Sequence, residues 1–99
     1  MEQVIQDFKK KVIDVLKDPS LKFLVFGSKD HNKNIPLLNF LIVSNPDYSD
    51  YLRKIEDIEE EMIVSHGILI NAILLNKKEM GQVKNDPMVI KAMKGGRPV

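Results

Sequence analysis

Cysteine is absent from the 99-residue sequence, which excludes disulfides and is typical of a protein in a reducing compartment. An excess of charge of either sign is also lacking. The 15 basic and 14 acidic side chains nearly cancel, so bulk electrostatics do not indicate nucleic-acid binding. No apolar run approaches the ~20 residues that a membrane helix needs. The amino-terminal stretch MEQVIQDFKKKVIDVL lacks the uncharged apolar core of a signal peptide. We therefore expect a cytoplasmic protein without a membrane segment.

Two kinds of site lack their usual motifs. His31 and His66 are far apart and no cysteine accompanies them, so a zinc site is not indicated. Ser28 does not lie in a Gly-x-Ser-x-Gly elbow, so a nucleophilic serine is not indicated either. Internal repeats, low-complexity tracts and linkers are also absent, and residues 1–99 are expected to form a single domain.

Three apolar runs predict strands at 21–26, 36–43 and 68–75. The second is apolar at almost every position, as in a strand covered on both faces, with Asn39 as the exception. The third is again nearly continuous in apolar residues, apart from Asn71. Gly27 is expected to permit a turn after the first strand, with Ser28 capping a helical turn. The polar stretch 29–34 is expected to be a surface loop or one turn of helix.

Helical periodicity predicts helices at residues 2–17 and from Asn45-Pro46 to about Ser65. Gly67 is a natural stop for the second helix. The acidic cluster of this helix (Glu56, Asp57, Glu59, Glu60 and Glu61) is interpreted as a solvated face. Asn76 and Glu79 have capping-box spacing, and Asp86-Pro87 opens a last helix that ends at Gly95-Gly96.

These elements predict an α/β (α+β) domain of order α-β-β-α-β-α-α, with a small mixed sheet and helices on one face. The residues expected in its core are Phe26, Leu41, Ile55, Ile58 and Ile70.

The order of elements, together with Phe26-Gly27-Ser28 after the first strand and the tail KKEMGQVKNDPMVIKAMKGG, resembles the minimal nucleotidyltransferases of the polymerase-beta superfamily. The resemblance covers nearly the whole chain. It implies that the Gly-Ser turn holds a nucleoside triphosphate. It also implies an Asp-x-Asp pair on the second strand and a further Asp on the third, which together bind two magnesium ions for phosphoryl transfer.

The metal-binding carboxylates of this pattern are replaced in the present sequence. Gly27 and Ser28 match the pattern, and Lys29 stands where an arginine is common, so these three are the candidate nucleotide-binding residues. The aspartate positions align with Leu37, Asn39 and Asn71, none of which carries a carboxylate.

Neutral amides cannot offset the charge of two metal ions and a triphosphate, so the catalytic metal site should be lost. Asp30, His31 and Asp47 are candidate substitute ligands, but none of them lies at a matching position. Asn39 and Asn71 are expected to be structural amides whose partners are neighbouring backbone groups.

The resemblance therefore implies a catalytically inactive, nucleotidyltransferase-like domain that works by binding a protein partner. The partner would be a helical, toxin-like protein, as in toxin–antitoxin modules, or a second copy of the chain. Two alternatives stay open: a nucleotide sensor that uses the Gly-Ser turn without chemistry, and an active nucleotidyltransferase with atypical ligands. Magnesium and a nucleoside triphosphate are expected as cofactors only if activity is retained.

Overall fold

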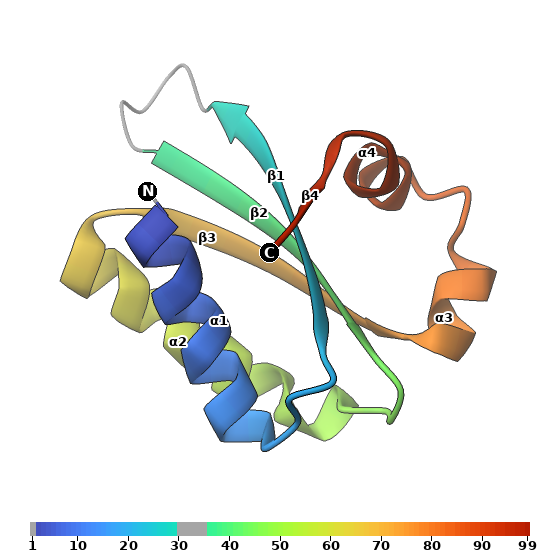
Figure 1. The fold of residues 1–99 in the computed structure, drawn as a ribbon, viewed down its shortest axis with the longest axis horizontal. Helices are drawn as coiled ribbons and strands as arrows, with labels where there is room; N and C mark the ends of the chain where they lie inside the picture. Colours follow the sequence, from blue (N-terminus) through green and yellow to red (C-terminus); the bar gives the residue numbers. More distant parts are fainter. Residues whose placement is uncertain (1, 30–35) are drawn as a thin grey trace.

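A four-stranded mixed sheet forms the centre of the computed structural model, which describes residues 2–29 and 36–99 (Figure 1). The strands are β1 (Lys22–Lys29), β2 (Pro36–Ser44), β3 (Leu69–Asn76) and β4 (Arg97–Pro98), in the spatial order β3-β2-β1-β4. β1 is antiparallel to β2 and β4, whereas β2 and β3 are parallel and need a long crossover between them. The predicted class and element order are confirmed.

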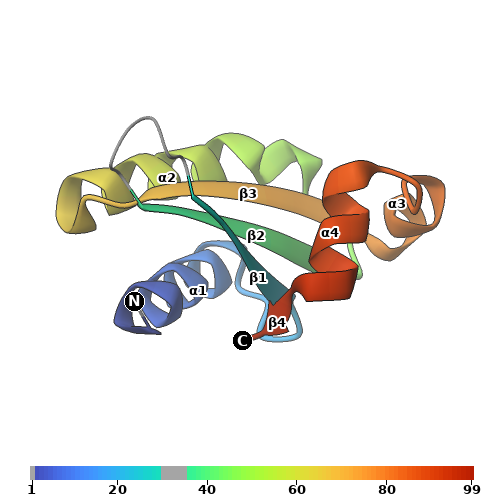
Figure 2. The same ribbon diagram turned by 90° about the horizontal axis from the view of Figure 1, so that it is seen from above.

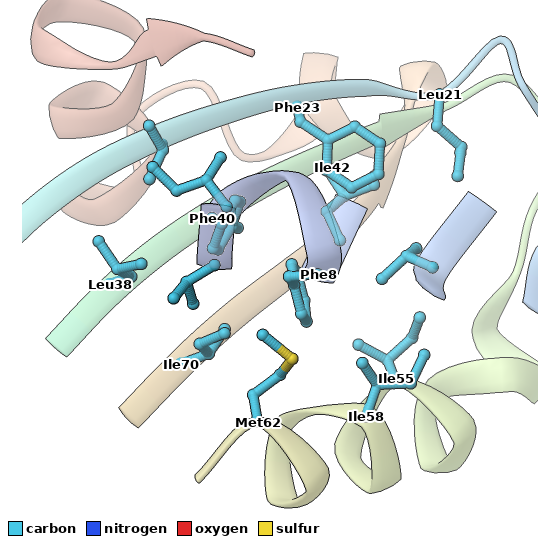
Figure 3. Packing of buried hydrophobic residues seen from close by; sticks show 14 of the residues in the cluster. Phe8, Leu21, Phe23, Leu38, Phe40, Ile42, Ile55, Ile58, Met62 and Ile70 are labelled. Atoms are coloured by element: carbon cyan, nitrogen blue, oxygen red, sulfur yellow. The ribbon is translucent and has the colours of Figure 1, made fainter. Parts of the chain in front are cut away.

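Two long helices cover one face of this sheet. They are α1 (Glu2–Leu16) and α2 (Leu52–His66), which provides the crossover from β2 to β3. Phe8 of α1 lies against Phe40 of β2 with 4.6 Å between the ring centroids, and Met62 of α2 belongs to the same cluster (Figure 3). Phe40, Phe8 and Met62 are fully buried, so this face holds the main core.

The opposite face is covered by the carboxyl-terminal part of the chain. Ala92 of α4 (Pro87–Gly95) packs with Phe26 and Leu41, and the short α3 (Lys77–Gln82) leads into this layer. Two views place α4 beside β1 and β4, away from α1 and α2 (Figures 1 and 2). The expectation that the helices share one face is therefore wrong for α4. The reason is that β2 is apolar on both faces, and its second face also has to be shielded from water.

The expected core residues Phe26, Leu41, Ile55, Ile58 and Ile70 are all buried, as predicted. β3 lies at the edge of the sheet, and its partly buried residues pack on both faces, Ala72 and Leu74 on one and Ile73 and Leu75 on the other. Ile70 is its single buried residue and Asn71 is exposed. In the described part of the chain, no helix is long and apolar enough to cross a membrane.

Several predicted helix ends are confirmed. Asn76 and Glu79 form a reciprocal capping box, and the Asp86 side chain accepts hydrogen bonds from Met88 N and Val89 N. Gly67 ends α2 in the left-handed conformation, with φ 66°. These ends were predictable because a cap depends on residues within one turn of the helix end.

The predicted start of the second helix at Asn45-Pro46 is wrong. Here a short 3-10 turn, η1 (Ser49–Tyr51), precedes α2. The Ser44 hydroxyl donates to the Pro46 carbonyl at 2.6 Å, and the Asp47 carboxylate accepts from Ser49 N at 2.9 Å. These local bonds compete with helical bonds and delay the helix.

A longer-range contact also holds this connection. The Tyr48 hydroxyl donates to Asp18 Oδ2 at 2.6 Å, and Asp18 accepts from the backbone and hydroxyl of Ser20 as well. The hydrogen bonds from Ser20 and Tyr48 lower the pKa of Asp18. The bond to Asp18 is the main cause that raises the pKa of Tyr48 to about 12. Asp18 thus ties the connection before β1 to the connection after β2.

We expect the pKa of Tyr48 to be measurable in the variant Tyr51→Phe, where Tyr48 is the one remaining tyrosine. Phenolate absorbance should titrate with a pKa of about 12. Asp18→Asn in the same background should lower it towards the ordinary value, because the carboxylate acceptor is gone. The stability from this bond is complete below the unfolded pKa of ~10 and is lost as pH rises through about 12. Asp14→Asn, an exposed carboxylate change, is the control and should leave the titration unchanged.

Candidate functional site

The three positions that align with the family's aspartates lie together on one face of the sheet. Leu37 and Asn39 are two residues apart on β2, so they point to the same side. Asn71 is the direct partner of Asn39 in the parallel β2–β3 pair. These positions occupy the starting ends of β2 and β3, away from α3 (Figure 1). The sheet register therefore gathers the three positions that the alignment selected.

The two asparagines are bonded to each other. Asn71 Nδ2 donates to Asn39 Oδ1 at 3.3 Å. Asn39 is 3% exposed whereas Asn71 is exposed, so the pair runs from the sheet interior to the surface. The sequence predicts neighbouring backbone groups as partners, and the structure shows an amide–amide pair between them. It arises because the parallel register places residues 39 and 71 side by side on neighbouring strands.

The donor atoms at these positions do not fit a pair of magnesium ions. Leu37 has no ligating atom, and the two amides are neutral and already share a hydrogen bond. Two divalent ions in a phosphoryl-transfer site need anionic oxygens that offset their charge. Among the described residues, no three acidic or histidine side chains gather as a metal site would require.

The candidate substitute ligands Asp30, His31 and Asp47 do not supply a metal site among the described residues. Asp47 follows the far end of β2, beyond Ser44, and its carboxylate caps Ser49 N. It is therefore at the opposite end of the strand from Asn39. Asp30 and His31 lie outside the described residues.

The predicted turn at Gly27-Ser28 is wrong, because β1 continues to Lys29. Gly27 pairs with Leu38, Ser28 with Leu37 and Lys29 with Pro36. The pairing partner β2 begins at Pro36, so the antiparallel ladder extends through these residues. Their backbone is a strand and not the start of a helix, and it lacks the converging N–H groups that favour an anion at a helix start. Register nevertheless places Ser28 opposite Leu37, so the Gly-Ser segment adjoins the asparagine pair.

Glu59 on α2, predicted to be part of a solvated face, contacts the edge strand β3 at the residue after Asn71. Its carboxylate accepts a hydrogen bond from Ala72 N, at 3.1 Å, on the edge strand β3. The side chain is half-buried, and burial raises the pKa of Glu59, with a smaller contribution from Glu56 and Glu60. Glu59 thus satisfies a backbone group at a sheet edge, which is one way of blocking edge-to-edge pairing. Helical spacing could have indicated it, because Glu59 lies four residues after Ile55 and three before Met62, at the border of the buried stripe of α2.

Replacing this carboxylate by an amide, Glu59→Gln, is expected to stabilise the protein at neutral pH. The amide oxygen can still accept from Ala72 N, and the cost of burying a charge disappears. Because the folded pKa is raised, the contribution of Glu59 to stability is complete below its unfolded pKa of ~4.5 and declines as pH rises through the folded value. Urea denaturation at several pH values should show this decline in the wild type and a flatter profile in the variant. Glu60→Gln, an exposed neighbour, should give a smaller gain; an equal gain would contradict the role of burial.

An apolar hollow lies elsewhere on the molecule. Its volume is about 570 Å³, and its lining includes Leu24 of β1, Val43 of β2, Met80 of α3 and Met93 of α4. Val43 is near the carboxyl end of β2, whereas Leu37 and Asn39 are near its start. The asparagine pair and this apolar hollow are therefore two separate features.

Comparison with family models, curated proteins and solved structures found no match to this chain. The class that the fold defines is a small α/β domain with a mixed sheet. The likeness to minimal nucleotidyltransferases stays a prediction from the order of elements and from the Gly-Ser segment.

Proposed function

We propose that the chain is a catalytically inactive, nucleotidyltransferase-like domain that acts by binding a partner protein. The observation that carries the proposal is the hydrogen bond between Asn71 and Asn39, two of the three positions where the resemblance places metal-binding carboxylates. An amide pair cannot supply the negative charge that holds two divalent ions together. The same pair can hold β2 and β3 in register without metal, which leaves the fold available for binding.

Exposed apolar side chains support a binding role. Met93 on α4 is 59% exposed, and Met88 and Ile90 on the same helix are each 36% exposed. Single exposed apolar residues are common on protein surfaces. Met93, however, borders an apolar hollow, and such a grouping is typical of an interaction site. A helical, toxin-like partner and a second copy of the chain both remain predictions, as does a cytoplasmic location.

Calorimetric titration with ATP, GTP and CTP, with and without magnesium, tests the loss of catalysis. We expect no magnesium-dependent binding and no incorporation of labelled nucleotide into protein. Nucleotide binding without magnesium would instead favour a sensor that uses Gly27, Ser28 and Lys29. Magnesium-dependent incorporation that stops in chelator would contradict the proposal and indicate an active enzyme with other ligands.

Affinity purification of the tagged chain from its native host tests the binding role. We expect a protein partner that elutes with the chain in a complex of defined mass. Light scattering of the purified chain alone distinguishes this from self-association. A chain that stays monomeric at high concentration and recovers no partner would contradict the proposal.

A further inference from the structure

The surface formed by α3, α4 and the strand ends beneath them combines apolar hollows with lysines. A second hollow of about 230 Å³ adjoins the hollow of about 570 Å³, and Met80 and Met93 line both. The larger hollow also reaches Phe23 and Leu24 of β1. We call the joint lining of the two hollows the α3–α4 surface. Its methionines are flexible, polarisable side chains that adapt to the shape of an apolar partner.

The charged side chains that line the α3–α4 surface have one sign. Among the described residues, the charged side chains that line the two hollows are Lys22, Lys77, Lys84 and Lys94. None of the four takes part in the ion pairs of the described residues, which join Lys11 to Glu61, His66 to Asp7 and Arg97 to Glu2. Four unpaired ammonium groups around an apolar floor are complementary to a ligand that has an apolar ridge flanked by carboxylates.

The shape of the surface favours a protein segment over a membrane. Apolar side chains on this surface line hollows, and a hollow receives side chains from a partner. Membrane-surface helices instead bury a protruding apolar face in the flat boundary of the lipid. Nucleic-acid binding is also disfavoured, because methionines and aliphatic side chains dominate the floor. Sites for single strands usually offer aromatic platforms for base stacking.

The backbone beside the surface favours a helical partner. The edge of β1 next to the larger hollow is already paired with β4, at Leu24–Pro98 and Val25–Arg97. Pro98 has no N–H, so β4 offers an added strand little main-chain bonding. A helix satisfies its own backbone groups and is recognised through side chains at intervals of three and four residues.

We infer that the α3–α4 surface binds an acidic amphipathic helix of a partner protein. The helix places its apolar ridge in the two hollows, and its flanking Asp or Glu side chains meet Lys22, Lys77, Lys84 and Lys94. The inference rests on the proposed function, since it names the chemistry of the partner and the surface that receives it. Met93 is the central contact, because it lines both hollows and is largely exposed.

The test uses the full chain and two synthetic helical peptides of about 18 residues with leucines at helical spacing. One peptide carries glutamates beside the leucines and the other carries lysines. Fluorescence anisotropy should show that the glutamate peptide binds at least about tenfold more tightly than the lysine peptide. Lys84→Glu/Lys94→Glu should abolish the preference, because Lys22 and Lys77 then face two glutamates across the same surface. Equal binding of the two peptides by the wild type, or binding of neither, would overturn the inference.

Met93→Glu tests the position of the surface. This variant should weaken binding of the glutamate peptide at least about tenfold, because it adds a like charge at the centre of the contact. Val64→Glu, the same kind of change at an exposed site on α2, is the matched control and should bind like the wild type. Circular dichroism and the thermal midpoint establish that both variants stay folded. If both variants weakened binding of the glutamate peptide equally, the inference would be overturned. It would also be overturned if the wild type bound phosphatidylserine vesicles tightly and the glutamate peptide did not displace them.

The partner recovered from the host separates this inference from the proposed function. If Met93→Glu loses a partner that wild type and Val64→Glu retain, the inference is supported. If Met93→Glu retains that partner, the inference fails while the proposed function stands. If the glutamate peptide binds but no partner is ever recovered, the inference about the α3–α4 surface is supported and the proposed function fails.

Discussion

Replacing Phe40 with alanine is expected to cost about 3–5 kcal/mol of unfolding free energy. Phe40 is fully buried on the central strand β2, and its ring packs at 4.6 Å between centroids against the ring of Phe8. Truncation removes apolar area and also leaves a cavity between the sheet and α1, which close packing does not let collapse. Small domains have only about 5–15 kcal/mol of stability, so a large share should be lost. Urea denaturation measures the effect.

Val64→Ala is the matched control for this truncation. Val64 is 86% exposed on α2, and shortening it should change stability by no more than about 0.5 kcal/mol. The slope of unfolding with urea should be similar in both variants, because the surface exposed on unfolding hardly changes. If the two variants shared one midpoint, Phe40 would not lie in a closely packed core.

Restoring aspartate at Leu37, Asn39 and Asn71 together is expected to create a magnesium-dependent fold. Register places the three positions on one face, with residues 39 and 71 side by side, so their carboxylates would crowd one another. Burial and like charge raise the pKa of such carboxylates and reduce stability when no cation is present. In chelator the triple variant should therefore unfold at a lower temperature than the wild type. Magnesium should restore stability, by about 2.7 kcal/mol at a concentration one hundred times the dissociation constant.

Leu37→Asn is the matched control, because it puts three amides where the triple variant has three carboxylates. It tests geometry without charge and should show no magnesium response. A single aspartate should respond weakly, since two ions need bridging anionic ligands. If the triple variant is folded and magnesium does not change its stability, the three side chains do not converge on one site. That result would contradict the alignment with the nucleotidyltransferases.

Local sequence patterns predicted part of the candidate site. The alternation of residues along β2 was enough to place Leu37 and Asn39 on one face, and the alignment added Asn71. That Asn71 bonds to Asn39 depends on the β2–β3 register, which joins residues 32 positions apart in the chain. Helical spacing places Glu59 at the border of the buried stripe of α2, but its acceptor role depends on Ala72 N lying within reach at the edge of β3.

The sequence by itself determined the three long strands, several helix ends and the five expected core residues. Apolar runs and helical spacing encode which face of an element is buried, and caps such as Asn76 with Glu79 act within one turn. Tertiary structure alone decided that α4 covers the second face and that Gly27 continues β1. Each of these outcomes depends on a partner distant in the chain, as in the packing of Ala92 on Phe26 and the pairing of Gly27 with Leu38. Such contacts form only when the sheet assembles, so no window of neighbouring residues contains the information that selects them.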